Sequence, residues 1–600
     1  MSKEIDLYAN NFGETYANLL PNLGQAMVDV LRFFECQRIY GVGGDYAANL
    51  IAAFEKEFDI CPSSNEMHAA FTACGQAEVE GLGVCLTTYT VGSLPCVSAA
   101  ALAVTEKLPV IFISGAPGES EITNMALHHT VSSCSTWKAE YDAALESFRA
   151  LGIKAERLQG QRNSAQPNVA AEQFFRLISH AYLNKQPVFI EIPRDLVNQK
   201  TQAITMPCSL IDLPQETYLL KGAHAVAKQI ISKLQQAKKP LLFLGVKAKL
   251  NPSLLHLIKQ FCHQYNIPYV TSWLAKGILD EYDSLSLGAY NGVFSPVEMR
   301  AYIEHEVDYV LEIATSINQL DTNIAFATGT HLLFEFENRT ILKGTAQLEK
   351  DIITTFEYLL GAELTSFDFT PVQTKKLPQR KEDRIDFHNL TSVLNQLQDS
   401  DDNAYIYFPE IGNSYFASYS LRTRNSSLGR SWLTNPWYAA MGTSIPYARA
   451  ACRKLKQQRS SDVAIVITGD GGFNFQLNDL IHFLRDELNI IIIYMRNDIF
   501  HLGKSGDADI YNCSDKTFNV IGLVNAFGGQ GKRCTSVGEF NDYFEYCAKE
   551  NNGIKLIEVP AIPEDQFQCR EISLLNVYIK AKNGLPDAVK QWQAIIDNKL

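Results

Sequence analysis

Several features that would assign this chain to a common class of protein are absent from its sequence. Its thirteen cysteines include no CxxC pair and no metal-ligand spacing, so reduced thiols in a cytosolic protein are expected. No apolar run reaches the roughly 18 residues that a membrane-spanning helix needs. The residues Met1–Asp6 contain no hydrophobic core of a signal peptide. These absences predict a cytoplasmic protein that does not enter a membrane.

The charge of the chain excludes a second group of functions. Its net charge is −13, and it has no basic run with interleaved aromatic residues, so neither nucleic acid nor an anionic membrane is an expected partner. No repeat and no low-complexity tract is present. With 46% apolar and 20% charged residues, the composition is that of a globular protein. Its 600 residues suggest roughly three or four domains.

A strand–turn–helix–strand pattern is the most informative stretch of the chain. The apolar run Val463–Ile467 predicts a buried strand, and Ile490–Tyr494 predicts a second one. Between them, Phe473–Leu488 is helix-like, with Leu477, Leu480, Ile481 and Leu484 at helical spacing. A glycine-rich turn directly follows the first strand, and its backbone N–H groups can face an anion: Gly469, Asp470, Gly471 and Gly472.

Two polar side chains follow the two predicted strands. Asp470 comes after the first strand and Asn497 after the second, so both are expected at the carboxyl edge of a parallel sheet, where α/β folds bind ligands. Carboxylate and amide oxygens suit Mg²⁺. A glycine-rich turn alone is weak evidence, because many α/β folds contain one as ordinary turn chemistry. Together with Asn497 it predicts a site for a metal-bound diphosphate.

This pair resembles the motif of thiamine diphosphate (ThDP)-dependent enzymes, in which GDG is followed by Asn after the next strand. The resemblance implies ThDP and Mg²⁺ as cofactors, with Asp470, Asn497 and the main chain of Ile499 as metal ligands. It also implies that Gly469, Gly471 and Gly472 lie against the diphosphate.

The first third of the chain alternates predicted strands and helices, which indicates a parallel sheet. Four polar residues follow or separate these elements, and each has an ordinary explanation. Asp45 could cap the next helix, Glu66 could be a carboxylate favoured at a helix start, and His128 and His129 could be exposed loop residues.

The arrangement of these residues resembles the pyruvate and indolepyruvate decarboxylase group of the ThDP family. The quoted motifs are Gly-Gly-Asp45-Tyr46, Asn65-Glu66, residues 87–92 and His128-His129-Thr130, and residues 185–195 look like the strand that closes that group's first domain. The resemblance implies Glu66 as the carboxylate that bonds the cofactor's pyrimidine ring. It implies that Asp45, His128 and His129 orient substrate and transfer protons.

The remainder of the chain also resembles this family. Residues 410–414 are similar to a loop at the diphosphate end, although Ile411 and Asn413 stand where Thr and Asp are usual. Residues 437–446 correspond to the segment that bends the cofactor, which implies that Met441 wedges between its two rings; ordinary core filling is the alternative. The cofactor-binding residues implied here are Gly412, Asn413, Ser414, Ala439 (through its carbonyl) and Met441.

The fold class that follows is α/β, with three domains of parallel sheets flanked by helices. We expect a pyrimidine-binding domain at 1–200, a middle domain at 220–362 and a diphosphate-binding domain at 385–600. The segments 201–219 and 365–386 are predicted linkers. The family implies a homodimer or homotetramer with the active site across the subunit interface, because Glu66 and the GDG turn come from different subunits.

The predicted function is ThDP- and Mg²⁺-dependent, non-oxidative decarboxylation of a 2-oxo acid such as pyruvate, indolepyruvate or phenylpyruvate to an aldehyde and CO₂. One position departs from the pattern, because Gly503 stands where decarboxylases have a glutamate that protonates the enamine. His501, Lys504 or Asp507 could supply this proton. The alternatives are a carboligase similar to acetolactate synthase, a branch that also binds FAD, and a ThDP-binding protein with weak or no turnover.

Overall fold

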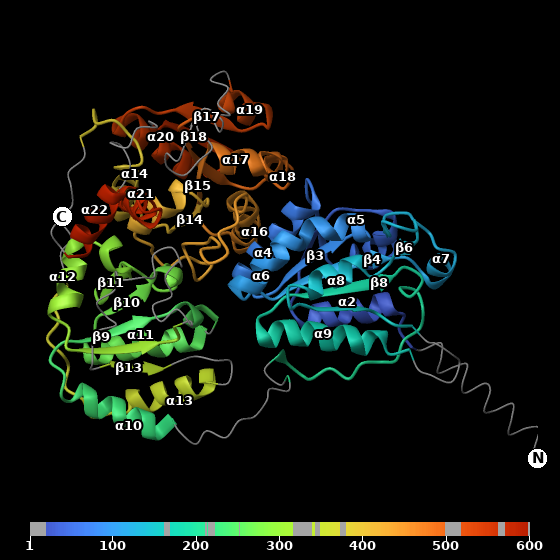
Figure 1. Ribbon diagram of the computed structural model, residues 1–600, viewed down its shortest axis with the longest axis horizontal. Coiled ribbons are helices and arrows are strands. Elements are labelled where there is room, and N and C mark those ends of the chain that lie inside the picture. Colours follow the sequence, from blue (N-terminus) through green and yellow to red (C-terminus); the bar gives the residue numbers. More distant parts are fainter. Residues whose placement is uncertain are drawn as a thin grey trace, which may run out of the picture. The chain divides into compact units, whose positions relative to one another are not determined.

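The computed structural model describes residues 20–160, 168–210, 213, 223–250, 252–315, 339–342, 348–371, 380–498, 518–561 and 570–597. The chain forms two compact units, Met1–Gln215 and Glu216–Leu600. Three parallel sheets flanked by helices make up these units, one in the first and two in the second (Figure 1). The predicted α/β class with parallel sheets is therefore confirmed.

The first unit contains a sheet of six parallel strands. In spatial order its strands are β2 (Asp59–Pro62), β1 (Arg38–Gly41), β3 (Gly83–Thr87), β4 (Val110–Ala116), β8 (Val188–Pro193) and β7 (Lys154–Arg157). The helices of this unit are α2 (Leu23–Phe33), α3 (Ala48–Phe54), α4 (Glu66–Glu80), α5 (Thr90–Ser93), α6 (Val97–Glu106), α7 (Glu119–Thr123), α8 (Ala143–Arg149) and α9 (Ala170–Asn184).

Local sequence explains where two of these helices begin and end. Asn22 caps α2 in a reciprocal capping box with Gln25, which satisfies two backbone N–H groups at the helix start. The helix α4 begins after Asn65, whose side chain accepts a hydrogen bond from the His68 amide, and it ends at Gly81 with φ +85°. Glycine adopts this left-handed conformation without the steric cost that other residues have.

The second unit begins with a sheet of five parallel strands. Their spatial order is β11 (Ser286–Tyr290), β10 (Tyr269–Ser272), β9 (Pro240–Leu244), β12 (Tyr309–Ile313) and β13 (Arg339–Leu342). The helices around this sheet are α10 (Ala223–Leu234), α11 (Pro252–Tyr265), α12 (Val297–His305) and α13 (Leu348–Leu360).

The other sheet of the second unit also has five parallel strands, and it contains the predicted strand–turn–strand pattern. Its spatial order is β14 (Tyr405–Pro409), β15 (Val463–Gly469), β16 (Ile490–Arg496), β18 (Ile554–Pro560) and β17 (Gln530–Arg533). The helices are α14 (Leu390–Asp399), α15 (Asn413–Ala417), α16 (Ser444–Gln458), α17 (Asp470–Gln476), α18 (Leu480–Arg485), α19 (Val520–Ala526), α20 (Val537–Glu550), α21 (Arg570–Lys582) and α22 (Pro586–Ile596).

The apolar strands of this last sheet are buried on both faces, as parallel sheets between helices are. Each isoleucine of Ile490–Ile493 is 0–2% exposed, and full burial of such a side chain contributes about 1.5–3 kcal/mol. Trp273, Val293 and Phe294, which lie near the middle sheet in sequence, belong to the core of the last sheet. The two sheets of the second unit therefore share packing, and the predicted domain limits stay predictions.

One sequence-based expectation about this region is wrong. Residues 473–488 do not form a single helix, because α17 begins at Asp470 and gives way to a 3₁₀ turn at Leu477–Asp479 before α18. The backbone of Gln476 leaves helical geometry (φ −137°, ψ 3°), while its buried side chain bonds Glu410, Ser444 and the Ile445 amide. Ile481 and Leu484 consequently remain exposed.

Two further expectations concern the segments between the predicted domains and the presence of membrane-spanning helices. The described residues 201–209, 365–371 and 380–386 contain no helix or strand, and the two linkers stay predictions. Among the described residues, no helix combines the length and the apolar character that crossing a membrane requires.

Candidate functional site

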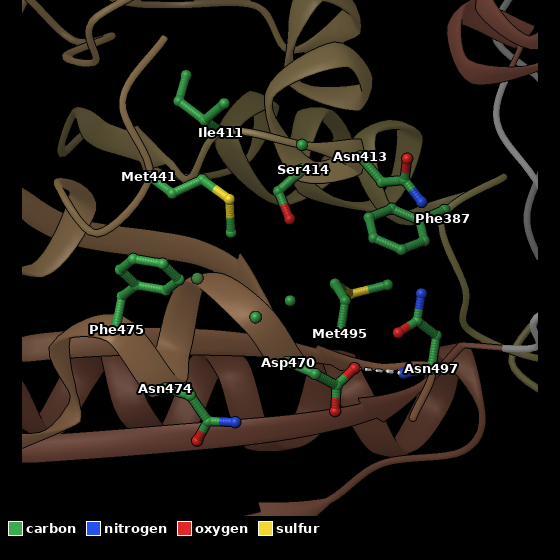
Figure 2. Close-up of a pocket in the computed structure, with 14 residues that line it drawn as sticks. Phe387, Ile411, Asn413, Ser414, Met441, Asp470, Asn474, Phe475, Met495 and Asn497 are labelled. Atoms are coloured by element: carbon green, nitrogen blue, oxygen red, sulfur yellow. Dashed lines mark hydrogen bonds between the residues drawn. The ribbon is translucent and has the colours of Figure 1, made fainter. Parts of the chain in front are cut away.

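A cavity of about 530 Å³ lies at the carboxyl ends of β14, β15 and β16. Parallel strands place their C-terminal loops at one edge of the sheet, which is where such folds bind ligands. In Figure 2, Asn413 and Ser414 lie across the cavity from Asp470 and Asn497. The lining residues are Phe387, Ile411, Gly412, Asn413, Ser414, Met441, Gly469, Asp470, Gly471, Gly472, Asn474, Phe475, Met495 and Asn497.

Asp470 is the first residue of α17 and is almost fully buried. Its Oδ1 accepts a hydrogen bond of 2.7 Å from the Tyr494 hydroxyl, and its Oδ2 accepts bonds of 2.9 and 3.2 Å from the Asn497 and Asp498 amides. Burial raises the pKa of Asp470 above its ordinary value, and the charge of Asp498 acts in the same direction, whereas the bonds from Tyr494 and Asn497 lower it. A bound cation would favour the ionised carboxylate.

Asn497 follows β16, and its side chain also lines the cavity beside Asp470 (Figure 2). The two predicted metal ligands are thus brought together at neighbouring strand ends, although they are separated in sequence by a helix and a strand. Ile499, the third predicted ligand, lies outside the described residues, as do His501, Gly503, Lys504 and Asp507.

The glycine-rich turn has room only for glycine at one position. A Cβ on Gly472 would lie 2.2 Å from Cγ of the buried Glu410, closer than nonbonded carbon atoms approach. On the opposite wall, Gly412 has φ +124°, a conformation that favours glycine. The buried Oδ1 of Asn413 has no hydrogen-bond partner among the described residues, so this wall offers a polar atom to a ligand.

Apolar side chains form another part of the wall. Met441 and Phe475 line the cavity, and their side chains are 39% and 54% exposed, which is unusual for residues of this size. Ala439 has φ +58° and donates its amide to the Asn435 carbonyl, but it is not among the lining residues. Nine of the ten predicted cofactor-binding residues therefore line the cavity, and Ala439 does not.

Glu410 connects three segments behind the cavity. Its carboxylate accepts hydrogen bonds from the Ile411 and Gly442 amides, the amide and hydroxyl of Ser444, and the Gln476 side chain, at 2.6–3.2 Å. Burial raises the pKa of Glu410, although these bonds oppose the rise. The carboxylate thereby ties the end of β14 to the turn that follows Met441 and to α17.

The sequence alone did not indicate several of these contacts. Phe387, Asn474, Phe475 and Met495 line the cavity without having been predicted. Tyr494 ends an apolar strand, so its hydroxyl bond to Asp470 left no local signal. The acidic residue at position 410, between the strand and the glycine, was the one visible hint of the network behind the cavity.

In the first unit, three predicted residues converge. Nε2 of His128 lies 3.3 Å from Oδ2 of Asp45, and Nε2 of His129 lies 3.4 Å from Oδ1. The two imidazole rings are 3.8 Å apart. Asp45 does not cap the following helix, since the cap position of that 3₁₀ turn is Gly44 and no side-chain cap bond forms. The capping explanation for Asp45 is therefore wrong.

Glu66 begins α4, directly after the cap residue Asn65. Its backbone carbonyl accepts a hydrogen bond from the Cys96 thiol, and its carboxylate is neither fully buried nor fully exposed. A Cβ on Gly92 would lie 3.5 Å from Oε1 of Glu66, an ordinary contact distance, so Gly92 lies next to this carboxylate.

The donor set of the cavity fits a diphosphate with a hard cation. Asp470 and Asn497 offer oxygen ligands, which Mg²⁺ prefers. Gly471 and Gly472 line the cavity next to Asp470, and the apolar wall with Met441 and Phe475 suits an aromatic ring system. The residues present therefore fit the predicted cofactor, ThDP with Mg²⁺.

Comparison with protein families gave three matches. Residues 21–136 match the N-terminal TPP binding domain of thiamine pyrophosphate enzymes, residues 227–341 match their central domain, and residues 410–559 match their C-terminal TPP binding domain. Together the three matches cover more than half of the chain, and each contains one of the three parallel sheets or most of it.

Curated proteins with similar sequences include a thiamine metabolism regulatory protein of Saccharomyces cerevisiae, which is 23% identical over 571 residues and covers 88% of this chain and 87% of its own. The pyruvate decarboxylase of Kluyveromyces marxianus is 23% identical over 570 residues, covering 90% of this chain and 94% of its own. An indole-3-pyruvate decarboxylase of Azospirillum brasilense is 27% identical over 308 residues, with coverage of 50% and 52%.

Proposed function

Because this chain belongs to the thiamine pyrophosphate enzyme family, we propose that it decarboxylates a 2-oxo acid without oxidation, using ThDP and Mg²⁺. The observation that carries this proposal is the pairing of Asp470 and Asn497 in one cavity with Met441. Pyruvate decarboxylases and an indole-3-pyruvate decarboxylase among the similar proteins support the class of substrate, a small 2-oxo acid.

The residues of the cavity would hold the cofactor in the following way. Asp470 and Asn497 would ligate Mg²⁺, with the main chain of Ile499 as a third ligand, and Gly471 and Gly472 would lie against the diphosphate. Met441 would contact the ring system from the apolar wall. When bound, the cofactor supplies the electron sink that the departure of CO₂ requires.

The residues of the first unit would orient the substrate and move protons. Glu66 would accept a hydrogen bond from the pyrimidine ring. The Asp45–His128–His129 cluster would orient the substrate and transfer protons, a role that imidazole and carboxylate groups can perform. Both Nε2 atoms lie 3.3–3.4 Å from the Asp45 carboxylate, which favours this role over the alternative that the two histidines are ordinary exposed loop residues.

The residues proposed for catalysis and cofactor binding are divided between the units, since Glu66 belongs to one and Asp470 to the other. We infer that the active protein is a homodimer or homotetramer in which each site combines the first unit of one chain with the second unit of another. This inference rests on the family resemblance and on the division of the site residues between the units. A cytoplasmic location remains a prediction from the sequence.

Carboligation is the second candidate, and the observation that favours it is Gly503. A decarboxylase needs an acid to release its aldehyde, and without one a second carbonyl compound can compete for the same carbon. Weak or absent turnover is the third candidate, which the name of the regulatory relative in Saccharomyces cerevisiae supports. The presence of Glu66, Asp470 and Asn497 speaks for turnover.

The deciding experiment incubates the protein with ThDP, Mg²⁺ and a panel of 2-oxo acids: pyruvate, branched-chain acids, phenylpyruvate and indolepyruvate. CO₂ is followed directly, and products are identified by NMR. Equal amounts of CO₂ and aldehyde support the decarboxylase, and a 2-hydroxyketone supports the carboligase. Absence of CO₂ from every acid, with ThDP bound, would refute turnover on this class of substrate.

Two variants sharpen this test. Glu66→Gln should abolish CO₂ release while the protein stays folded, because the pyrimidine ring loses its carboxylate partner. Gly503→Glu should shift products toward free aldehyde if the missing acid is what directs the carbon to a second carbonyl. An unchanged product ratio in Gly503→Glu would assign the proton to another group.

A further inference from the structure

The two histidines of the proposed active site belong to an exposed loop. They lie in the segment between α7 and α8, residues 126–141, which we call the histidine segment. His128 is 61% and His129 32% exposed at the side chain, and His129 has φ +55°. Because the loop is exposed and His129 has a left-handed backbone conformation, other contacts are needed to keep both imidazole rings next to Asp45.

Tyr141, the last residue of the histidine segment, is hydrogen-bonded to the first residue of the segment. Its hydroxyl donates a 2.8 Å hydrogen bond to the carbonyl of Ala126, the first residue of the segment. Just before Tyr141, the short strand β6 (Ala139–Glu140) pairs antiparallel with β5 (Val131–Ser132). The segment is therefore a closed loop that can move only as a unit unless these bonds break.

The carbonyl of Tyr141 attaches this loop to the large sheet. It accepts a 2.5 Å hydrogen bond from Nη2 of Arg157 and a 2.6 Å bond from the Tyr89 hydroxyl. Arg157 ends β7, and Tyr89 follows β3 and is fully buried. Two donors on one carbonyl oxygen, one from β7 and one from just after β3, leave the end of the histidine segment little freedom.

Glu191 fixes the arginine that makes this contact. It faces Arg157 across the β7–β8 ladder, and its Oε2 accepts a 2.9 Å hydrogen bond from Nε and forms an ion pair with Nη2 at 2.7 Å. Glu191 is fully buried, and its Oε1 has no hydrogen-bond partner among the described residues. Asp142 lies 3.2 Å from Nη1 of the same arginine.

A buried ion pair of this kind costs desolvation energy and is often no better for stability than apolar residues of the same size. Its benefit is geometric, because the planar guanidinium can bind Glu191 and the Tyr141 carbonyl at the same time in one orientation.

The aromatic ring of Tyr46 lies close to the ring of Tyr89 and to the histidine segment. Its centroid is 5.7 Å from that of Tyr89 and 6.0 Å from that of His128.

We propose that Arg157, fixed by Glu191, is a positioning residue that holds the histidine segment through the Tyr141 carbonyl, so that His128 and His129 face Asp45. This proposal rests on the proposed function only for its catalytic consequence. The positioning itself is a property of the folded first unit and can be measured without substrate.

The test compares Arg157→Met and Glu191→Gln with wild type in the full-length protein. Hydrogen exchange, followed by mass spectrometry, should become faster in peptides from 126–141, and more so for Arg157→Met. With substrate, kcat should fall about tenfold to a hundredfold, as expected for misplaced reacting groups. The affinity for ThDP should not change, because neither Arg157 nor the histidine segment is among the residues proposed to bind the cofactor.

The matched control is the ion pair of Arg176 with Glu156, the residue next to Arg157 on β7. Glu156→Gln removes a carboxylate from the same strand without touching the histidine segment, so both exchange and kcat should stay at wild-type values. Arg157→Lys should restore only part of kcat, because an ammonium group cannot reproduce the forked contact.

Tyr141→Phe provides a second test in case Arg157→Met does not fold, because it removes only the hydrogen bond to the Ala126 carbonyl. It should speed exchange in the same peptides. Unchanged exchange in 126–141 for folded Arg157→Met and Tyr141→Phe would overturn the proposal. If wild type lacks turnover but the exchange effect is present, positioning stands and the proposed function fails.

Discussion

At the scale of single residues, the buried Asp470 has two roles. It is the first candidate metal ligand, and it also accepts hydrogen bonds from Tyr494, Asn497 and Asp498. These donors orient both oxygens before a cation arrives, and such outer contacts commonly contribute strongly to metal affinity. The hydroxyl of Tyr494 is the donor that can be removed with the least change in volume.

We therefore predict that Tyr494→Phe weakens the Mg²⁺-dependent binding of ThDP by about tenfold. Titration calorimetry at fixed ThDP concentration measures this. Tyr407→Phe is the matched control, because Tyr407 is buried in β14 of the same sheet and its hydroxyl has no partner among the described residues. Equal affinity loss in both variants would contradict the role of the Tyr494 bond.

A second prediction at this scale concerns the pH dependence of stability. Burial raises the pKa of Glu191 to about 7 from its ordinary 4.5, with Arg157 opposing and Asp142 reinforcing the rise. Between these two values the folded protein binds more protons than the unfolded chain, so this group makes stability fall as pH rises through the window.

The thermal midpoint of wild type relative to Glu191→Gln should accordingly decrease between pH 5 and pH 8, as measured by scanning calorimetry. Glu156→Gln is the control, since Arg176 and Gln173 lower the pKa of Glu156 against the effect of burial, so that it stays ionised across this range. A wild-type midpoint that stays constant or rises with pH relative to that of Glu191→Gln would contradict a raised pKa of Glu191.

At the scale of elements, the Glu410 network explains how three separate segments keep one cavity. The end of β14, the turn after Met441 and α17 meet at this carboxylate, and Gln476 interrupts the helix to reach it. Hydrophobic packing places these elements near one another, but the directional bonds fix the turn relative to the glycine-rich loop.

Glu410→Gln should destabilise the protein by about 1–3 kcal/mol, because an amide group turned toward the donors leaves some of them unpaired. It should also lower ThDP affinity, since the turn next to Met441 loses its anchor. Denaturant unfolding and calorimetry measure the two effects. Glu545→Gln, an exposed change on α20, should change neither the stability nor the ThDP affinity. Unchanged stability and unchanged affinity in Glu410→Gln would contradict the role of the network.

At the scale of the whole molecule, the division into two units decides how a site can be assembled. Glu66 lies in the first unit, and Asp470 lies in the second. If each site combines units of two chains, a dimer has two sites, and a defect in one unit affects only the site to which that unit contributes.

Coexpression of Glu66→Gln and Asp470→Ala chains therefore tests the assembly. Each variant alone should be inactive, whereas a mixed dimer contains one intact site of two and should have about half of wild-type activity. Activity is measured on purified, mixed dimers selected with two affinity tags; the unselected random mixture should have about a quarter. No recovery in dimers shown to contain both chains would mean that each site is built within one chain.

The sequence by itself determined the architecture and the chemistry of the binding edge. Runs such as Val463–Ile467 and Ile490–Tyr494 indicate buried parallel strands wherever they occur, because their burial depends on local composition. Asp470 and Asn497 follow such runs, so their meeting at one edge could be predicted from strand order alone. The alternation of strands and helices in the first third likewise predicted a parallel sheet, and the family resemblance implied the three-domain arrangement.

The tertiary structure decided the contacts between residues far apart in the chain. Gln476 breaks an apparently regular helix in order to bond Glu410, and Arg157 joins Glu191 to the Tyr141 carbonyl. Neither contact leaves a periodic pattern, because a hydrogen bond depends on the position and direction of two groups that only the folded chain brings together. Local sequence therefore specified the elements, and long-range geometry specified how their polar side chains form a site.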